Sequence, residues 1–240
     1  MIEVRHLSKV FRLPHAKKRT LYHNIISTVT QQYDYEEFYA LKDMSFAVHH
    51  GEFVGIIGKN GSGKSTLLKI LANIFKPTTG EVIIQDRVFP LLELGVGFQA
   101  DFSVRDNIYL YGALLGFSRT EMTGKVREIL EFAELERFAD TKLQRLSTGM
   151  QMRLGFAIAI QSFAPIMLVD EVLAVGDLSF VEKCFSVFAD FKRRGTTVLL
   201  VSHDLGSIEQ LCDRVLVVAN GELLNQGDPK SMIEFYSSVA

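Results

Sequence analysis

Gly58-Lys-Asn-Gly-Ser-Gly-Lys64-Ser65-Thr66 is the stretch of sequence that decides the fold. It has the spacing Gly-x-x-x-x-Gly-Lys-[Ser/Thr] of a phosphate-binding loop. The apolar run Phe53–Ile57 before it predicts a buried strand, and Leu67–Asn73 after it predicts a helix. Glycines let backbone N–H groups surround an anion, and a helix N-terminus attracts negative charge. The stretch therefore predicts a strand–loop–helix unit that binds a nucleoside triphosphate.

Each side chain of this loop has an expected role. We expect Lys64 to reach the β- and γ-phosphates and the Ser65 hydroxyl to bind Mg²⁺. The alternative, a glycine-rich turn that binds nothing, is disfavoured by the strand and helix on either side. The other residues expected to surround the phosphates of ATP are Gly58, Asn60, Gly61, Ser62, Gly63 and Thr66.

Composition narrows the class of protein. The 240 residues predict one large domain, or one core with a subdomain, and 48% of them are hydrophobic, which is ample for a core; the formal net charge is −2. That charge gives no reason to propose nucleic-acid binding. Cys184 and Cys212 are expected to be reduced thiols. No secretory signal or membrane span is expected, so the chain is predicted to be cytoplasmic and to need a partner for any membrane function.

Short apolar runs predict most of the other elements. Residues 103–160 are expected to be helical, with one apolar face formed by Ile129, Leu130, Ala133, Leu135 and Phe138. Val215–Ala219 and Glu222–Asn225 are expected to form a hairpin around Asn220-Gly221. A closing helix is expected at Pro229–Ser238. The remaining strands are expected at Ile2–Phe11, Met44–Val48, Glu81–Gln85, Ile166–Val169 and Thr196–Val201.

The segment of about residues 13–39 has a pattern of its own and is treated as an insertion. A basic cluster, Lys17-Lys18-Arg19, precedes apolar residues at helical spacing, and acidic residues close the segment. We expect an amphipathic helix that faces the membrane–water boundary or a partner, with the basic cluster near lipid phosphates. A helix packed on its own domain is the alternative. The apolar residues are Leu21, Tyr22, Ile25, Ile26 and Val29, and the acidic ones Asp34, Glu36 and Glu37.

A pair of carboxylates ends the buried run Ile166–Val169. Asp170 is suited to hold Mg²⁺, and Glu171 to polarise the water that attacks the γ-phosphate. An apolar run followed by Asp-Glu is common by itself. After a phosphate loop it is a strong indication of NTP hydrolysis.

A further motif, Leu146-Ser147-Thr148-Gly149-Met150, precedes the apolar helix Leu154–Ile160. It resembles the signature Leu-Ser-Gly-Gly-Gln of the ATP-binding cassette, and nearly the whole chain resembles the nucleotide-binding subunit of an ABC transporter. The resemblance implies a single cassette over residues 1–240. Its expected parts are a RecA-like P-loop NTPase core, an antiparallel β subdomain and a helical signature subdomain of about 103–160.

In that family the signature meets the γ-phosphate bound to a second subunit. The resemblance therefore implies that Ser147, Thr148 and Gly149 contact ATP held by a second copy of this chain, in a head-to-tail dimer. Two residues depart from the signature: Thr148 replaces Gly, and Met150 replaces Gln. Because Ser147 and Gly149 remain, function is expected to survive. Ser147 is also expected to cap the helix.

The resemblance assigns roles to three further positions. His203, after the strand Thr196–Val201, matches the switch histidine that contacts the γ-phosphate and the catalytic glutamate. Gln99 matches the glutamine that touches Mg²⁺ and the attacking water and links the site to the membrane partner; a solvent-facing loop glutamine is the alternative. Residues 174–177 match the loop that crosses the dimer interface.

Phe11 matches the family's aromatic residue that stacks on adenine, at the end of the first strand. Tyr39 is the second candidate. Either ring could instead belong to the core.

Three features resemble ATPase subunits that export lipid-linked polysaccharide: the insertion, the run Leu91–Leu110, and Asp170–Asp177. The pattern Leu-Glu-Leu-Gly at 92–95 favours the O-antigen branch over the teichoic acid branch. The expected partners are a polytopic permease and the lipid-linked glycan, and the expected place is the cytoplasmic face of the inner membrane. Because the chain stops at Ala240, no C-terminal carbohydrate-binding domain is expected. An importer, a drug exporter, or a soluble ABC ATPase of DNA repair or translation are the rival classes.

Overall fold

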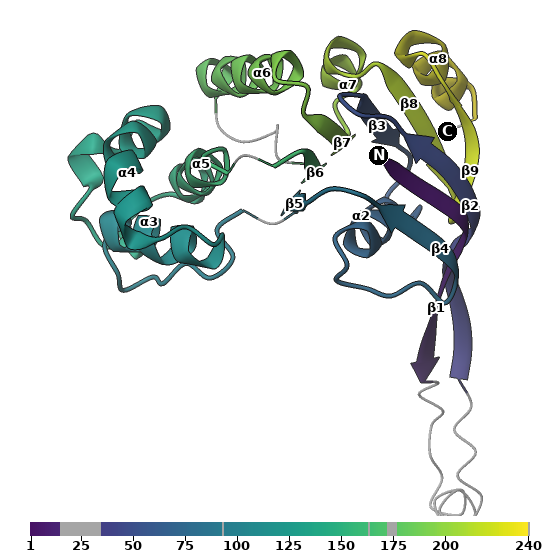
Figure 1. The fold of residues 1–240 in the computed structure, drawn as a ribbon, viewed down its shortest axis with the longest axis horizontal. Helices are drawn as coiled ribbons and strands as arrows, with labels where there is room; N and C mark the ends of the chain where they lie inside the picture. The colour runs from purple at the N-terminus through teal and green to yellow at the C-terminus, as the bar shows by residue number, and fades with distance from the viewer. Residues whose placement is uncertain (15–34, 93, 163, 172–176, 240) are drawn as a thin grey trace, which may run out of the picture.

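The computed structural model describes residues 1–14, 35–92, 94–162, 164–171 and 177–239. Within these residues the chain is an α/β protein with two sheets and a separate group of helices, as Figure 1 shows. The predicted fold class is therefore confirmed. The elements follow one another with β3 and α2 on either side of the glycine-rich loop.

The central sheet has the strand order β5-β6-β7-β3-β8-β9. Strand β3 (Phe53–Ile57) lies in its middle and pairs in parallel with β7 (Thr197–Val201) and β8 (Arg214–Ala219). Strand β6 (Ile166–Asp170) continues the parallel sheet, and β9 (Glu222–Gly227) closes its other edge in antiparallel fashion. The strands that are covered on both faces are almost wholly apolar, as buried parallel strands require.

Strand β5 (Val88–Leu91) at the edge of this sheet was missed by the sequence analysis. It has four residues, and one of them is Pro90. A proline cannot donate a hydrogen bond to a neighbouring strand, so a short run that contains one carries a weak strand signal. At a sheet edge one side of the strand needs no donor, which is why Pro90 is tolerated there.

The second sheet is antiparallel and has the order β2-β1-β4. Strands β1 (Ile2–Pro14) and β2 (Tyr35–Val48) run past β4 (Thr79–Ile84) as a two-stranded arm, visible below the body in Figure 1. The two ends of the expected insertion of about 13–39, residues 13–14 and 35–39, are strand and belong to this arm. Local patterning could not show this pairing. The expected amphipathic helix and its basic cluster lie outside the described residues.

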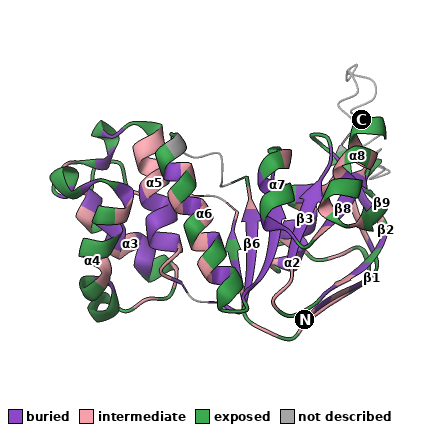
Figure 2. Ribbon diagram, turned by 90° about the horizontal axis from the view of Figure 1, so that it is seen from above, coloured by how far each residue is buried: buried purple, intermediate pink, exposed green. Residues whose placement is uncertain are grey.

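Four helices pack against the sheets. Helix α2 (Lys64–Leu71) follows the glycine-rich loop, and α6 (Leu178–Arg193), α7 (Leu205–Leu211) and α8 (Pro229–Val239) lie on the opposite face of the central sheet. Alternation along β3 explains the two faces: Phe53 and Ile57 join one core and Val54 and Ile56 the other. Figure 2 shows these strands buried between the two layers.

The remaining helices form a group with its own core, built on Val104, Ile108, Met122, Ile129 and Leu154. It consists of α3 (Val104–Leu114), α4 (Arg119–Ala133), two short 3-10 helices, η1 (Glu136–Phe138) and η2 (Leu143–Arg145), and α5 (Thr148–Ala159).

The expected apolar face of residues 129–138 is correct except at its end. Glu134 ends α4 in the left-handed conformation, so the helical period does not continue beyond it. Leu135 is still buried, but Phe138 lies in η1 with an exposed side chain.

The predicted hairpin is present as β8 and β9. Asn220 and Gly221 both have positive φ, 51° and 82°, which a two-residue hairpin turn requires. Cys184 and Cys212 are free and buried. Within the described residues, no helix is long and apolar enough to cross a membrane.

Candidate nucleotide-binding site

The glycine-rich loop joins the end of β3 to the start of α2. Its path needs glycine at two positions. A Cβ on Gly58 would lie 2.0 Å from the Val218 carbonyl oxygen, and one on Gly63 would lie 2.5 Å from that of Ala40. Gly63 also has a φ of 106°. A larger residue at either position would push the loop off the sheet that supports it.

The turn between β8 and β9 supports the loop from below. The Gly221 N–H donates to the Ser62 carbonyl over 3.0 Å, and the Gly221 carbonyl accepts from the Lys42 N–H over 2.7 Å. The turn thus connects the loop to β2. This support was missed by the sequence analysis, since nothing local links residue 221 to residue 62.

Lys64 begins α2 and is buried. Its ammonium group donates to the carbonyl oxygens of Gly58 and Lys59 over 2.7 and 2.9 Å. Desolvation lowers the pKa of Lys64, and the charges of Glu171 and Asp170 oppose that shift. The side chain therefore lies folded along the loop, where an anion would be bound.

Asp170 ends β6 beside the start of α2. The Ser65 hydroxyl donates to its carboxylate, and desolvation is the main cause that raises the pKa of Asp170. Its Oδ1 atom is buried and has no hydrogen-bond partner among the described residues. A hydroxyl and a carboxylate with a free buried oxygen are the oxygen ligands that Mg²⁺ prefers, so this pair fits the ion.

Glu171 and His203 form the next pair, at the ends of β6 and β7. His203 Nε2 lies 2.7 Å from Glu171 Oε1, and both side chains are about half exposed. Glu171 has a φ of 53°, an uncommon conformation for glutamate, while its N–H donates to the Val201 carbonyl over 2.9 Å. This turn directs the glutamate side chain to the same edge as Asp170.

Gln99 makes no hydrogen bond to this group among the described residues. Its backbone N–H donates to Asn107 over 2.7 Å, its side chain donates to the Gly97 carbonyl over 3.4 Å, and its carbonyl accepts from the Phe102 N–H over 3.1 Å. Asn107 is fully buried and also donates to the carbonyls of Gln99, Ser103 and, at 3.4 Å, Phe102. Asn107 thus attaches the Gln99 loop to α3. Its buried amide was a signal that the sequence analysis left without a role.

The signature residues begin α5, in the helical group. The Ser147 hydroxyl accepts from the Met150 N–H over 3.3 Å and so caps the helix as expected. Gln151 donates to the carbonyls of Leu143 and Leu146 over 3.2 and 3.1 Å, which stabilises the chain leading into the cap. Figure 1 places α5 apart from α2. No hydrogen bond among the described residues joins Ser147, Thr148 or Gly149 to the phosphate loop.

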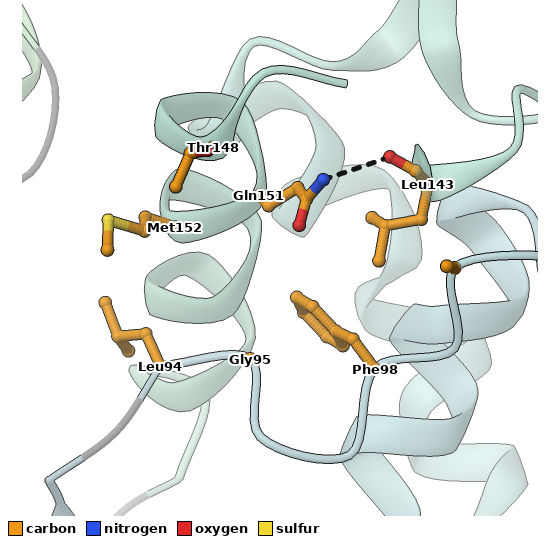
Figure 3. A pocket seen from close by; sticks show the side chains of 8 residues that line it. Leu94, Gly95, Phe98, Leu143, Thr148, Gln151 and Met152 are labelled. Atoms are coloured by element: carbon orange, nitrogen blue, oxygen red, sulfur yellow. Dashed lines mark hydrogen bonds between the residues drawn. The ribbon is translucent and has the colours of Figure 1, made fainter. Parts of the chain in front are cut away.

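A cavity of about 280 Å³ lies between the start of α5 and the segment before Gln99. Figure 3 shows Thr148, Gln151 and Met152 on one side and Leu94, Gly95 and Phe98 on the other. A Cβ on Gly155 would lie 3.0 Å from the Gly95 nitrogen, so the helix and this segment approach closely. The Gln99 segment therefore packs against the signature helix.

Phe11 and Tyr39 both lie on the β1–β2 pair. The Phe11 ring makes an edge contact with Phe75 at 5.7 Å, and the Lys9 ammonium lies 5.1 Å from the Phe11 ring. Tyr39 is paired with Val10 and is about half exposed. Both aromatic candidates for adenine stacking therefore remain candidates.

The other expected residues lie as follows. Asn60, Gly61 and Thr66 are in or next to the loop, with Asn60 and Gly61 exposed. Asp177 caps α6 and accepts from the Phe180 N–H over 3.1 Å. Residues 174–176 lie outside the described part of the chain.

Comparisons with known proteins agree with this geometry. Residues 41–174 match the ABC transporter family. The chain is 43% identical over 203 residues to the O-antigen export system ATP-binding protein RfbB of Klebsiella pneumoniae, covering 85% of this chain and 82% of that protein. It is 39% identical over 201 residues to the teichoic acids export ATP-binding protein TagH of Listeria innocua, covering 84% of this chain and 60% of that protein.

The fold resembles solved cassettes over nearly its full length. It matches a dimeric, post-hydrolysis structure of the ATP-binding cassette MJ0796 bound to ADP and Pi, with a TM-score of 0.75 and 27% identity, covering 95% of this chain and 99% of that one.

A phosphate loop beside an Asp-Glu strand end and a histidine defines a P-loop ATPase. The family match and the identities above make the assignment narrower: the chain belongs to the ABC transporter family of ATP-binding subunits, in which ATP hydrolysis is coupled to transport.

Proposed function

We propose that this chain is the ATPase subunit that powers export of a lipid-linked polysaccharide of the O-antigen type. A separate permease would carry the glycan across the cytoplasmic membrane, with this chain at the cytoplasmic face. The identity to O-antigen export proteins over most of both chains supports this substrate class. The identity to teichoic acid exporters keeps teichoic acid or another surface glycan as the alternative.

The observation that carries the proposal is the convergence of the loop, Asp170, Glu171 and His203 at the carboxyl ends of β3, β6 and β7. Lys64 would exchange its two loop carbonyls for phosphate oxygens. Backbone N–H groups of the loop would surround the same phosphates. Phe11, or else Tyr39, would stack on the adenine.

Mg²⁺ would be held by the Ser65 hydroxyl and Asp170, with Gln99 as a further ligand on its loop. When bound, the ion supplies positive charge that neutralises the phosphate oxygens. Glu171 would accept a hydrogen bond from the attacking water and take up its proton. His203, 2.7 Å from Glu171, would orient that carboxylate and contact the γ-phosphate.

The signature residues Ser147, Thr148 and Gly149 would contact the γ-phosphate on a second copy of the chain. Their helix N-terminus presents free N–H groups, and within one chain they belong to a different group of elements from the loop. Two copies packed head to tail would therefore complete two sites. The dimer found for the related cassette MJ0796 is the precedent.

Mixing two inactive variants tests the shared site. Lys64→Ala and Ser147→Arg each damage both sites of a homodimer. In a mixed dimer, one site carries both defects and the other carries none. Mixing equal amounts should restore about a quarter of wild-type hydrolysis, as random pairing predicts for two independent sites. Mixed dimers that form with ATP and still do not hydrolyse it would contradict the shared site.

Reconstitution tests the substrate. The chain and its permease, placed in vesicles, should move a lipid-linked glycan on addition of ATP, and the same vesicles carrying Glu171→Gln should not. Transport of a free sugar or a drug, without movement of the glycolipid, would favour the rival transporter classes.

A further inference from the structure

Arg153 of α5 forms ion pairs with residues at the end of α4 and the start of α6, and it has no role in the site described above. It lies on α5, six positions after Ser147, and its side chain is only 15% exposed. Nη1 donates to Glu134 over 3.0 Å, and Nη2 donates to Asp177 over 2.8 Å. The guanidinium also lies 5.0 Å from the centre of the Phe180 ring. The guanidinium therefore contacts the end of α4 and the start of α6.

The two acidic partners are themselves ordered by helix ends. Asp177 caps α6, where its Oδ1 accepts from the Ser179 hydroxyl over 2.7 Å and from the Phe180 N–H. The Ser179, Phe180 and Arg153 hydrogen bonds lower the pKa of Asp177 to about 2. Glu134 ends α4 and is also paired with Lys183 of α6, which lowers its pKa. Both carboxylates are therefore charged at neutral pH.

These contacts cross between two parts of the molecule. Helices α4 and α5 belong to the helical group, whereas α6 covers the central sheet. Asp177 follows Glu171 by six positions in the sequence. Arg153 thus connects the helix that begins at Ser147 to the start of α6.

Apolar packing joins the same helices, but it orients them less strictly. Phe180 contacts Phe132 at 5.6 Å and Phe156 at 6.1 Å. Burial of such rings is nearly independent of direction. A guanidinium bound to two carboxylates has a fixed planar geometry, so it tolerates little rotation of one helix on another.

We propose that Arg153 is a positioning residue: through Asp177 and Glu134 it fixes the angle at which α5 presents Ser147. The packing of Phe132, Phe156 and Phe180 holds the helices together, and the paired charges set their orientation. The proposal rests on the proposed function only in that the oriented surface is the one offered to a second copy's nucleotide.

The orientation is measurable in the nucleotide-free single chain. Spin labels on Thr120→Cys of α4 and Gln210→Cys of α7, both exposed positions, report the distance between the helical group and the sheet. Cys184 and Cys212 stay unlabelled, because burial raises the pKa of each thiol to about 12. Arg153→Ala should shift or broaden the distance distribution. An unchanged distribution would overturn the proposal, whatever happens to hydrolysis.

Matched variants separate orientation from stability. Arg127→Ala removes an exposed ion pair to Glu131 within α4 alone and should leave the distribution unchanged. Arg153→Lys keeps the charge but not the planar guanidinium, and it should restore part of the wild-type distance distribution. Asp177→Asn keeps the helix cap and should broaden the distribution. A lower melting temperature for Arg153→Ala, with no change in distance, would assign Arg153 to stability alone and reject the proposal.

Kinetics give a second readout. Arg153→Ala should lower kcat about tenfold, within the range of coupling between contacting groups, while binding of ATP to the single chain stays unchanged. Loss of ATP binding would contradict a positioning role. Since the distances need no dimer, failure of the mixing experiment would leave this proposal standing, and the reverse also holds.

Discussion

Two regions, the carboxyl ends of β3, β6 and β7 in the central sheet and the start of α5, differ in how many groups of a nucleotide site each contains. At the carboxyl ends of these strands, Lys64 contacts its own loop, Ser65 contacts Asp170, and Glu171 contacts His203. At the start of α5, Ser147 makes only a helix cap among the described contacts. One region holds charged and acid–base groups together, whereas the other is a capped helix end. The comparison predicts that groups for both ATP binding and hydrolysis lie in the first region, whereas the start of α5 affects hydrolysis without affecting ATP binding by the single chain.

The largest effect on hydrolysis should come from a substitution at the carboxyl end of β6. Glu171→Gln removes the proton acceptor but keeps the shape, so kcat should fall about a thousandfold, within the range for general-base groups. ATP binding should be retained. Steady-state hydrolysis and a fluorescent-nucleotide titration measure the two effects. Glu209→Gln, on the exposed surface of α7, is the matched control and should hydrolyse ATP normally. Normal turnover of Glu171→Gln would show that another group accepts the proton.

A paired substitution tests the contrast directly. Lys64→Ala should weaken ATP binding by the single chain tenfold or more, at about 1.4 kcal/mol for each factor of ten, because a charged phosphate contact is lost. Ser147→Ala should leave that binding unchanged and lower hydrolysis. It should also reduce the free energy of unfolding by about 1 kcal/mol, the usual value of a helix cap. Equal loss of ATP binding in both variants would remove the distinction between the regions.

A moderate effect is expected where the Gln99 loop joins α3. Asn107→Ala leaves the part-buried carbonyls of Gln99 and Ser103 without this donor, so the free energy of unfolding should fall by about 2 kcal/mol. Urea denaturation measures it. Asn225→Ala, in β9, removes only a local contact to the Gln226 N–H and should change stability little. If the two variants were equally stable, Asn107 would have no special role in holding the loop.

The smallest effect concerns the sheet core. With pKa values of about 12, the thiols of Cys184 and Cys212 should be almost wholly protonated at pH 8, with about one thiolate in ten thousand. Alkylation should therefore be slow in the native chain and rapid in urea. The pKa of each thiol is raised because desolvation disfavours the charged thiolate, and this is why alkylation should be slow. Fast labelling of the native chain would show that α6 or α7 opens readily.

Much of the site at the carboxyl ends of the central strands could be predicted from sequence, because the motifs that form it are short and contiguous. A strand, a glycine-rich loop and a helix are contiguous, and Asp170 directly follows an apolar run. The helical group was predicted less well. Its period ends at Glu134, whose left-handed conformation leaves Phe138 exposed. Strand β5 has only four residues and contains Pro90, so no local pattern marks it as a strand, and the pairing of 13–14 with 35–39 joins residues that local patterning does not connect.

The sequence by itself determined the phosphate loop, the order of the motifs and the family that they define, because each motif is a short run with fixed spacing. Only the tertiary structure decided which of these runs meet. The contacts of Gly221 with Ser62, of His203 with Glu171 and of Arg153 with Asp177 join residues that are distant along the chain. Such contacts depend on strand order and helix packing, and these follow from burial of the whole chain rather than from any local pattern.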